Sequence, residues 1–419
     1  MKGLNQKLIV IMGAIVAIAG FATAQPLMVV GTGNPDIDVP AVQSAVDQGG
    51  TVVLMGRFSF DRPPTAPAAA IYNRMVTVSK RVVISGAPDY QGRMPTIEAG
   101  NWPFFIDAAG ANVTIERLHF VAPKAGAIWV YAAGGLTIAN CRIESLQPTA
   151  EFGMQAGQAN PLAGAIFVGA DPHPPNAVNP GMPGNFSGTL AILNNDIEVG
   201  ATTPGPQMLG IVMFAVGKAP DKEVDIYVSG NRIRNLSEVA INFRLIGGRT
   251  RTERNVIVTG VIGSSDVIRV VGSGSHLVAH NSIDCGWPGG VATGINVFAQ
   301  ASPLPSEVGA IIVDNEITMS APQDAVFASN SAGIQIGGPA QGNAVLNNRI
   351  RGRAAAAIML FRRNGATPGN NTFVSNDLTD FQPSVANVFL DAGATNTVIV
   401  GSSTSLEDHG SGTVVIPMP

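Results

Sequence analysis

Cysteine and charge are both scarce in this sequence of 419 residues. The two cysteines, Cys141 and Cys285, are too few for a disulfide scaffold, so we expect two free, buried thiols and a fold stabilised by packing. Charged residues make up 13% of the chain, with 25 basic against 29 acidic side chains, so there is no broad positive field to attract phosphate backbones. We therefore expect no nucleic-acid partner.

Low-complexity composition is absent as well. Glycine and proline contribute 49 and 29 residues, which is below the roughly 25–30% share of low-complexity chains, and 46% of the residues are hydrophobic. Abundant glycine, valine, isoleucine and asparagine favour strands and turns over long helices. The composition therefore indicates an ordered, mostly β protein.

An apolar run opens the chain. Lys2 and Lys7 precede an apolar stretch over residues 8–22, and Ala22-Thr23-Ala24 has the small-x-small pattern of a cleavage site. The run of about 15 residues is shorter than the roughly 20 needed to span a membrane. We therefore predict a signal peptide over residues 1–24, a secreted, periplasmic or cell-surface location, and no stable membrane insertion after cleavage.

A short phrase returns along most of the chain: apolar residues, then asparagine, any residue, and isoleucine or leucine. Copies begin at Asn140, Asn195, Asn231, Asn281, Asn315, Asn348 and Asn376, with degenerate copies at Glu116 and Gly260. Most steps between them are about 21 to 36 residues, as in the turns of a solenoid. Asparagine tolerates a left-handed corner and can bond to the asparagine one turn away, so we predict an asparagine ladder.

A second phrase, typically glycine or alanine before isoleucine, falls between successive asparagines. It occurs at residues 126–130, 164–168, 210–213, 240–243, 267–270, 294–297, 333–336 and 357–360. With strands before and after each asparagine, every turn holds three strands. We predict an all-β fold, a right-handed single-stranded parallel β-helix of about ten rungs. An antiparallel sandwich would not repeat the glycine-isoleucine strand so regularly.

The start of the chain also carries a helical pattern. Residues 38–46 have the spacing of a short amphipathic helix that Asp38 can cap and Gly49-Gly50 can end. Such a helix would cover the unpaired edge of the first rung. We therefore predict a signal peptide over 1–24, a segment with a capping helix over 25–48, the β-helix over 49–400, and a closing strand or tail over 401–419.

The chain resembles the right-handed parallel β-helix proteins of the pectate-lyase-like superfamily. The resemblance rests on the helix followed by Gly49-Gly50-Thr51-Val52-Val53 and on the rungs over 49–400. It implies a fold rather than one activity, because members cleave, epimerise or bind polysaccharides and others are adhesins or surface scaffolds. Polysaccharide is the partner that it implies, and acidic glycans are one class of it.

Two columns of side chains are expected on the outward face of the glycine-isoleucine strands, from Trp129 to Met359 and from Tyr131 to Phe361. Aromatic rings suit stacking on sugars, while amides and guanidinium groups suit hydroxyls and carboxylates. The predicted substrate-binding residues are Trp129, Phe167, Phe214, Asn242, Arg244, Arg269, Asn296 and Gln335. The alternative, which we weight equally, is an ordinary exterior whose aromatic rings are covered by loops over 147–163 and 172–185.

Arg244 and Arg269 are expected on neighbouring rungs, where two like charges require screening. A uronate carboxylate would provide it and would favour an acidic glycan. The plainer alternative is an ion pair with a nearby acid, for which the sequence offers Glu238, Glu253 and Asp266.

Asp171-Pro172-His173 resembles the Asp-Pro-His element of mannuronan C5-epimerases, β-helix enzymes that use histidine and tyrosine for proton transfer with aspartate support. The resemblance implies catalytic roles for Asp171 and His173, with Tyr131 as the nearby phenol. The alternative is a solvated histidine in a proline-rich loop.

If the protein is an enzyme, a polysaccharide lyase or C5-epimerase fits better than a two-carboxylate hydrolase, because the columns lack paired carboxylates. We predict no metal and no cofactor.

The sequence thus supports two functions of different kinds. The first is a secreted or surface β-helix that binds polysaccharide along its outward strand face, with lyase- or epimerase-like activity if the region of Asp171 and His173 is competent. The second is a non-catalytic structural or adhesive solenoid.

Overall fold

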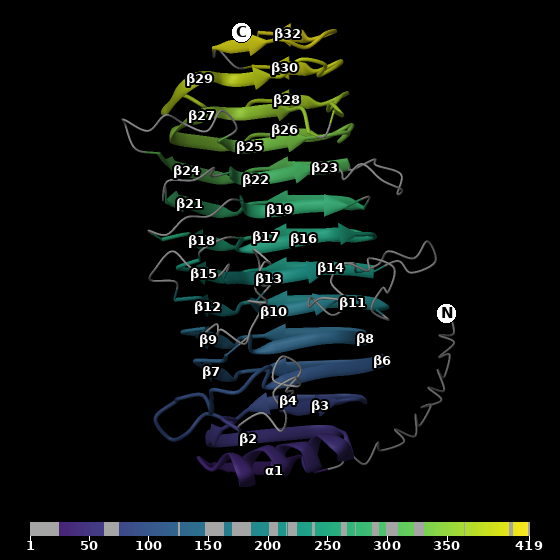
Figure 1. Ribbon diagram of the computed structural model, residues 1–419, viewed down its shortest axis with the longest axis vertical. Helices are drawn as coiled ribbons and strands as arrows, with labels where there is room; N and C mark the ends of the chain where they lie inside the picture. The colour runs from purple at the N-terminus through teal and green to yellow at the C-terminus, as the bar shows by residue number, and fades with distance from the viewer. Residues whose placement is uncertain are drawn as a thin grey trace, which may run out of the picture.

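The computed structural model is a parallel β-helix in which one chain winds through stacked rungs along a single axis (Figure 1). Named strands pair in parallel from rung to rung, which confirms the predicted fold class. The structure describes residues 25–62, 75–124, 126–146, 163–169, 186–200, 208–214, 216, 224–236, 239–260, 266–272, 274–286, 293–298, 309–321, 331–363, 365–401 and 405–417.

Three stacks of strands form the sides of the helix, and the pairings define them as a first, a second and a third face. The first face holds β3 (Val76–Val78), β6 (Phe104–Glu116), β8 (Ile128–Ala139), β10 (Ala163–Gly169), β13 (Met208–Phe214), β16 (Ile241–Ile246), β19 (Asp266–Gly272), β22 (Thr293–Phe298), β25 (Ala332–Gly337), β27 (Arg349–Phe361), β29 (Phe381–Leu390) and β31 (Leu406–Asp408).

The second face holds β1 (Leu27–Thr32), β2 (Gly50–Ser59), β4 (Val82–Gly86), β11 (Gly188–Leu193), β14 (Val224–Ser229), β17 (Arg249–Glu253), β20 (Ser275–Ala279), β23 (Gly309–Val313), β26 (Ala344–Leu346), β28 (Thr372–Val374), β30 (Val398–Val400) and β32 (Val414–Ile416). The third face holds β5 (Thr96–Glu98), β7 (His119–Val121), β9 (Arg142–Glu144), β12 (Asp196–Glu198), β15 (Arg232–Arg234), β18 (Val256–Val258), β21 (Ser282–Gly286) and β24 (Glu316–Ser320). The long strands β2, β6, β8 and β27 turn a corner and pair on two faces.

Aliphatic side chains stacked in register fill the interior. Ile211, Ile241 and Ile268 follow one another through β13, β16 and β19 and are fully buried. The glycine before such an isoleucine has a steric reason, because a Cβ on Gly294 would lie 2.6 Å from the backbone oxygen of Gly333 in the next rung. Core packing and close backbone approach therefore explain the repeated glycine-isoleucine phrase.

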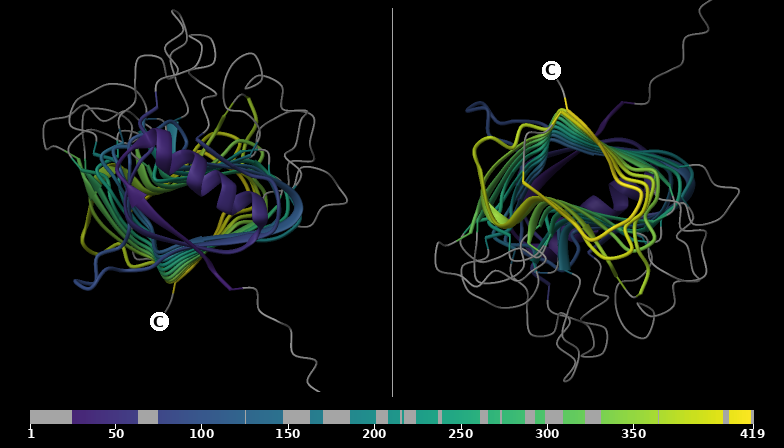
Figure 2. Two further views of the ribbon diagram at one scale, coloured as in Figure 1. Left: turned by 90° about the horizontal axis from the view of Figure 1, so that it is seen from below. Right: turned by 90° about the horizontal axis from the view of Figure 1, so that it is seen from above.

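Helix α1 (Pro35–Gln48) lies across the N-terminal end of the β-helix, as predicted (Figures 1 and 2). Val39, Val42 and Val46 on its inner side are buried in the same core cluster as the rungs. Gly49 ends the helix with a positive φ of 75°. The apolar interior is thus closed at this end.

The start of α1 differs from the prediction. Asn34, not Asp38, is the N-cap, because the Asn34 side chain accepts a hydrogen bond from the Asp36 N–H at 3.0 Å. Asp38 is buried instead. Its carboxylate accepts hydrogen bonds from the backbone N–H groups of Thr32 and Ser59. It therefore ties the helix to the preceding strand β1, which the sequence analysis missed, and to β2.

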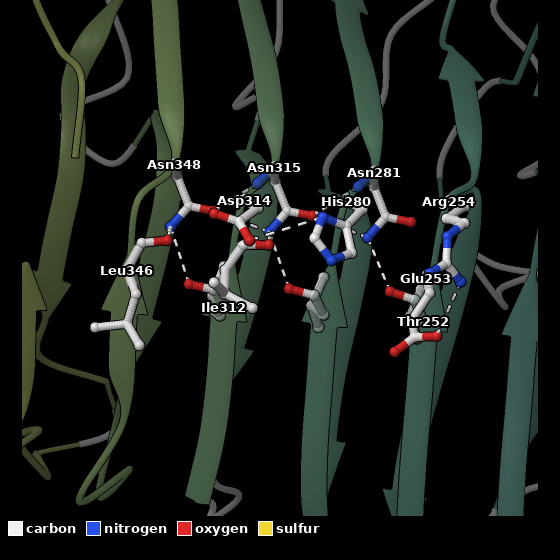
Figure 3. A network of polar contacts seen from close by, with 12 residues as sticks. Thr252, Glu253, Arg254, His280, Asn281, Ile312, Asp314, Asn315, Leu346 and Asn348 are labelled. Carbon is white, nitrogen blue, oxygen red and sulfur yellow. Dashed lines mark hydrogen bonds and ion pairs between the residues drawn. The ribbon is translucent and has the colours of Figure 1, made fainter. Parts of the chain in front are cut away.

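An asparagine ladder runs along the corner between the second and third faces, as predicted. Each side-chain amide donates to the Oδ1 of the asparagine one rung further on, at 2.9–3.0 Å, and the part near Asn315 is drawn in Figure 3. The ladder consists of Asn195, Asn231, Asn255, Asn281, Asn315, Asn348 and Asn376. Each amide that donates up the ladder also donates to a backbone carbonyl, so these buried groups are well satisfied.

Two details of the ladder differ from the prediction. Cys141 rather than Asn140 holds the ladder position in its rung, and its backbone N–H donates to Asn195 Oδ1 at 2.9 Å. The anchor assigned to Gly260 is Asn255 instead. The left-handed conformation falls on the residue before each ladder position, for example His280 with φ 55°. At each corner, one residue adopts the left-handed conformation and the next one occupies the ladder position, whereas we had expected a single asparagine to do both.

Both cysteines are free and buried, as predicted. Over the described residues, no helix has the length and apolar character to cross a membrane. The predicted signal peptide over residues 1–24 lies outside the described part of the chain.

Candidate functional site

The two predicted columns exist on the first face. Strand pairings place one set of side chains in line along the axis: Trp129, Phe167, Val212, Asn242, Arg269, Asn296, Gln335 and Met359. The neighbouring column contains Gly169, Phe214, Arg244, Val271, Phe298, Gly337 and Phe361. Strand alternation therefore identified both columns from the sequence, except for Tyr131, which the pairings of β8 do not place in line with Gly169.

The aromatic half of this face is a packed cluster and not an open platform. Trp129, Phe167 and Phe214 are buried, and they belong to an apolar cluster separate from the main core. The Trp129 ring lies 5.8 Å from Trp102 and 4.8 Å from Phe105, measured between centroids. The rings are therefore buried, contrary to the expected exposed platform, while their covering by the assigned loops stays a prediction. Residues 147–162 and 172–185, to which we assigned the covering, lie outside the described residues.

Trp129 also makes a polar contact that fits this packing. Its Nε1–H donates to the backbone oxygen of Gly169 at 3.3 Å, so the indole is anchored at its polar end as well. A sugar stacking on Trp129 would need the face of a ring that is only 1% exposed. Packing is therefore the first role of the aromatic half.

The polar half of the face begins where Asn242 and Arg269 follow the aromatic residues. Arg269 Nε donates to Asp266 Oδ2 at 2.6 Å, and Asn296 Nδ2 donates to Asp266 Oδ1 at 3.0 Å. The plainer alternative for Arg269, an ion pair with Asp266, is therefore correct. Arg244 lies with its guanidinium carbon 5.5 Å from the centroid of the Phe214 ring.

Asp266 is a site residue that the column analysis missed. Alternation assigns it to the same side as Ile268, which is in the core. It is the first residue of β19, and its carboxylate reaches outward to Arg269 three residues later. The available signal was an acid three positions before an outward arginine.

Two amide oxygens of the polar half lack hydrogen-bond partners among the described residues. These are Asn242 Oδ1 and Asn296 Oδ1, on the rungs on either side of Arg269. Both side chains are almost fully buried. A buried acceptor without a partner costs about 1–3 kcal/mol, so each of these two oxygens is unfavourable as it stands.

Arg363, which follows β27, completes this polar half and was not predicted. Its guanidinium carbon lies 3.8 Å from the centroid of the Phe298 ring. The register explains the contact, because Gly337 separates Phe298 from Phe361 in the column and has no side chain to obstruct the arginine. Burial lowers the pKa of Arg363, which Asp266 opposes and Arg269 reinforces. The described residues place no carboxylate at ion-pair distance from Arg363.

The remaining predicted site residues do not form a single cluster among the described residues. Gln335 Nε2 donates to Met359 Sδ at 3.6 Å within the buried column. Tyr131 is half-buried beside Phe105, with ring centroids 6.3 Å apart. Asp171 and His173 lie outside the described residues, so their predicted roles stay predictions.

Neither a protein-family model nor a curated protein matches this chain. Solved structures similar to it include the A-module of the Azotobacter vinelandii mannuronan C-5 epimerase AlgE6, at 13% identity and TM-score 0.39 over 91% of this chain and 96% of that one. A PL6 alginate lyase in complex with a trisaccharide has 13% identity and TM-score 0.44 over 92% and 88%. A mutant tailspike protein of E. coli bacteriophage HK620 in complex with a pentasaccharide has 12% identity and TM-score 0.44 over 91% and 77%. This chain is a parallel β-helix, and identities this low specify none of its site residues.

Proposed function

We propose that this protein is a secreted or surface β-helix that binds an acidic polysaccharide on the polar half of its first face. The observation that carries the proposal is the position of Arg363. Its guanidinium stacks on the Phe298 ring, is open to solvent and lies near Arg269, without an ion-pair partner among the described residues. A guanidinium held over an aromatic ring and open to solvent can form charge-assisted hydrogen bonds with an anionic ligand. The carboxylate of a uronic acid has the charge and the planar geometry that a guanidinium group binds best.

The neighbouring groups suit the rest of such a ligand. Asn242 and Asn296 stay proposed as substrate contacts; their amide oxygens are buried, so a sugar hydroxyl would reach them only after neighbouring side chains move. Asp266 holds Arg269 in place through a hydrogen bond of 2.6 Å, so less side-chain entropy is lost on binding.

The proposal also includes catalytic roles for three further residues. His173 and Tyr131 would transfer protons at C5 of a uronate, with Asp171 in support, in a lyase- or epimerase-like reaction. Tyr131 is at the aromatic end of the face, beside Phe105. Trp129, Phe167 and Phe214 stay proposed as substrate contacts, a role secondary to their packing.

Binding can be tested with polyuronates and a neutral glucan in affinity electrophoresis, using Arg363→Gln as the variant. We expect affinity for the polyuronates to fall about tenfold or more, because a charge-assisted hydrogen bond contributes about 1.5–3 kcal/mol. Arg362→Gln is the matched control, since it removes the same charge from the neighbouring residue, which is also exposed, and leaves the contact of Arg363 with Phe298 in place. It should bind like the wild type.

The outcomes separate the two functions. Equal loss in both variants would indicate a diffuse charge effect and contradict the site. No retardation by any glycan would favour the structural or adhesive solenoid, a function that the burial of Trp129 and Phe167 also supports. The same incubations, assayed for unsaturated uronates and for C5 inversion, test the catalytic part separately from binding.

A further inference from the structure

The outward side of the second face carries an apolar patch on β20, β23, β26, β28 and β30, which follow one another along the axis (Figure 1). Strand register arranges the outward residues in two neighbouring columns. The first column is Leu277, Ile311, Ala344, Thr372 and Val398, and the second is Ala279, Val313, Leu346, Val374 and Val400. Neither column contains a charged residue. Within the described chain these strands chiefly contact strands of the same stack, and Ile311 is 48% exposed.

The third face of the same rungs has a different outward surface. Arg351 lies 3.0 Å from Glu316, and Arg349 lies 3.0 Å from Asp380, measured between side-chain nitrogen and oxygen atoms. Ion pairs of this kind are expected on strands that face water. A contiguous apolar patch on the neighbouring face of the same rungs therefore indicates an interaction surface.

We propose that the apolar patch is the centre of an interface with a second copy of this chain. In this interface a two-fold axis runs parallel to the β-helix axis and passes between the two columns. Each rung then faces the same rung of the second copy, and the first column of each copy faces the second column of the other. Such a contact uses one surface on both copies and closes as a pair.

The charges of the adjoining rung fit this arrangement. Arg251 and Glu253 of β17 continue the first and the second column, directly before Leu277 and Ala279. Arg251 is exposed and forms no ion pair among the described residues, whereas Glu253 lies 3.6 Å from Arg254. In the proposed arrangement each Arg251 faces Glu253 of the second copy, which gives two ion pairs across the interface.

The same charges exclude the other simple orientation. A two-fold axis perpendicular to the β-helix axis would place the first column opposite itself. Arg251 would then face either an aliphatic residue or Arg251 of the second copy, and both contacts are unfavourable for a cation. Charge complementarity therefore favours the parallel orientation.

The sizes of the facing side chains are complementary as well. In the parallel orientation Leu277 faces Ala279 of the second copy, and Leu346 faces Ala344 of the second copy. A large side chain opposite a small one allows two sheets to pack closely without voids.

The extent of the patch suits the centre of a stable interface. Five strands about 4.8 Å apart, with a width of about five residues, give roughly 400 Å² of apolar surface. A stable interface buries about 800 Å² on each partner, and polar residues surround its apolar centre. Such residues are present: Arg249 and Ser275 lie on one side of the patch, His280 and Asp314 lie on the other, and all four are exposed.

The first test is the mass of the purified protein, measured by size-exclusion chromatography with light scattering over a wide range of concentrations. We expect twice the mass of one chain at high concentration and no larger species. Ile311→Lys should give the mass of one chain throughout, because it places a charge in the apolar centre. Val256→Lys is the matched control, since Val256 is similarly exposed, at 45%, but lies on the third face. It should keep the doubled mass.

The second test addresses the orientation. Arg251→Glu should raise the dissociation constant of the pair about tenfold or more, because it places two carboxylates opposite each other. The double variant Arg251→Glu with Glu253→Arg should restore association, since the opposite charges face each other again. Circular dichroism establishes that each variant is folded.

Several outcomes would overturn the proposal. They are the mass of one chain for the wild type at every concentration, which would assign the patch to a different partner, and a species larger than a pair. A doubled mass in folded Ile311→Lys, or equal loss in Val256→Lys, would do so as well. Failure of the double variant to associate better than Arg251→Glu would overturn the parallel orientation.

Discussion

At the scale of the residue, His276 shows how the β-helix treats an ionisable group in its interior. It lies between Thr250 and Ala310 in an inward column of the second face. Nδ1 is 2.9 Å from Thr250 Oγ1, and Nε2 has no partner within the described chain. Burial lowers the pKa of His276 from 6.5 to about 4. The ring is therefore neutral in the folded protein at neutral pH.

This pKa predicts a pH-dependent stability. Below about pH 6.5 the unfolded chain binds a proton that the folded chain does not, so stability should fall until about pH 4 and then level off. Each unit of pKa difference corresponds to about 1.4 kcal/mol, so the total loss is a few kcal/mol. Urea unfolding across this range should show the loss in the wild type and a smaller one in His276→Gln. Parallel curves for the two proteins would contradict the assignment.

At the scale of the element, the corner ladder turns single amides into a structural unit. Asn281 Oδ1 accepts hydrogen bonds from both the backbone N–H and the side-chain amide of Asn255, at 3.0 and 2.9 Å. Asn281 itself donates to Asn315 and to the carbonyl of Thr252, as Figure 3 shows. One side chain therefore holds three rungs in register.

Asn281→Ala should destabilise the protein by about 2 kcal/mol or more, because it leaves buried donors of Asn255 without an acceptor. His280→Asn is the adjacent control. His280 is exposed and has φ 55°, a conformation that asparagine adopts readily, so the change should stay within about 0.5 kcal/mol. Denaturant midpoints measure both. Equal effects would show that the ladder adds nothing beyond the corner conformation.

The first face consists of two halves with different outward side chains. Its N-terminal half packs Trp102, Phe105 and Trp129 into an apolar cluster outside the main core, and its C-terminal half carries Arg269 and Arg363. The strands are alike in both halves. The outward residue of each strand decides whether the face packs or presents polar groups.

At the scale of the whole molecule, stability comes from stacked rungs without covalent cross-links. Cys141 and Cys285 are free, and burial raises the pKa of both thiols, for Cys141 to about 12. Thiolate, the reactive form, is therefore scarce in the folded state.

We expect a thiol reagent to modify neither cysteine in the native protein and both after unfolding in denaturant. Addition of a reductant should leave the melting temperature unchanged, since there is no disulfide to break. Rapid native modification, or a lower melting temperature with reductant, would contradict the packing around the two thiols.

Local sequence patterns were sufficient to predict the β-helix, the capping helix and the columns. Strand alternation and recurring Asn-x-Ile and glycine-isoleucine phrases are local patterns, and a solenoid repeats them from rung to rung. Even the line from Trp129 to Met359 followed from this repetition.

The burial of those columns and the pairing of their charges could not be predicted from such patterns, because both depend on tertiary contacts. Trp129 is buried by residues such as Trp102 that precede it in the sequence and that no alternation rule connects to it. Arg363 reaches Phe298 across an intervening rung, which depends on the missing side chain of Gly337. Alternation determines to which side a residue points, whereas burial and ion pairing depend on segments distant in sequence that only the folded chain brings together.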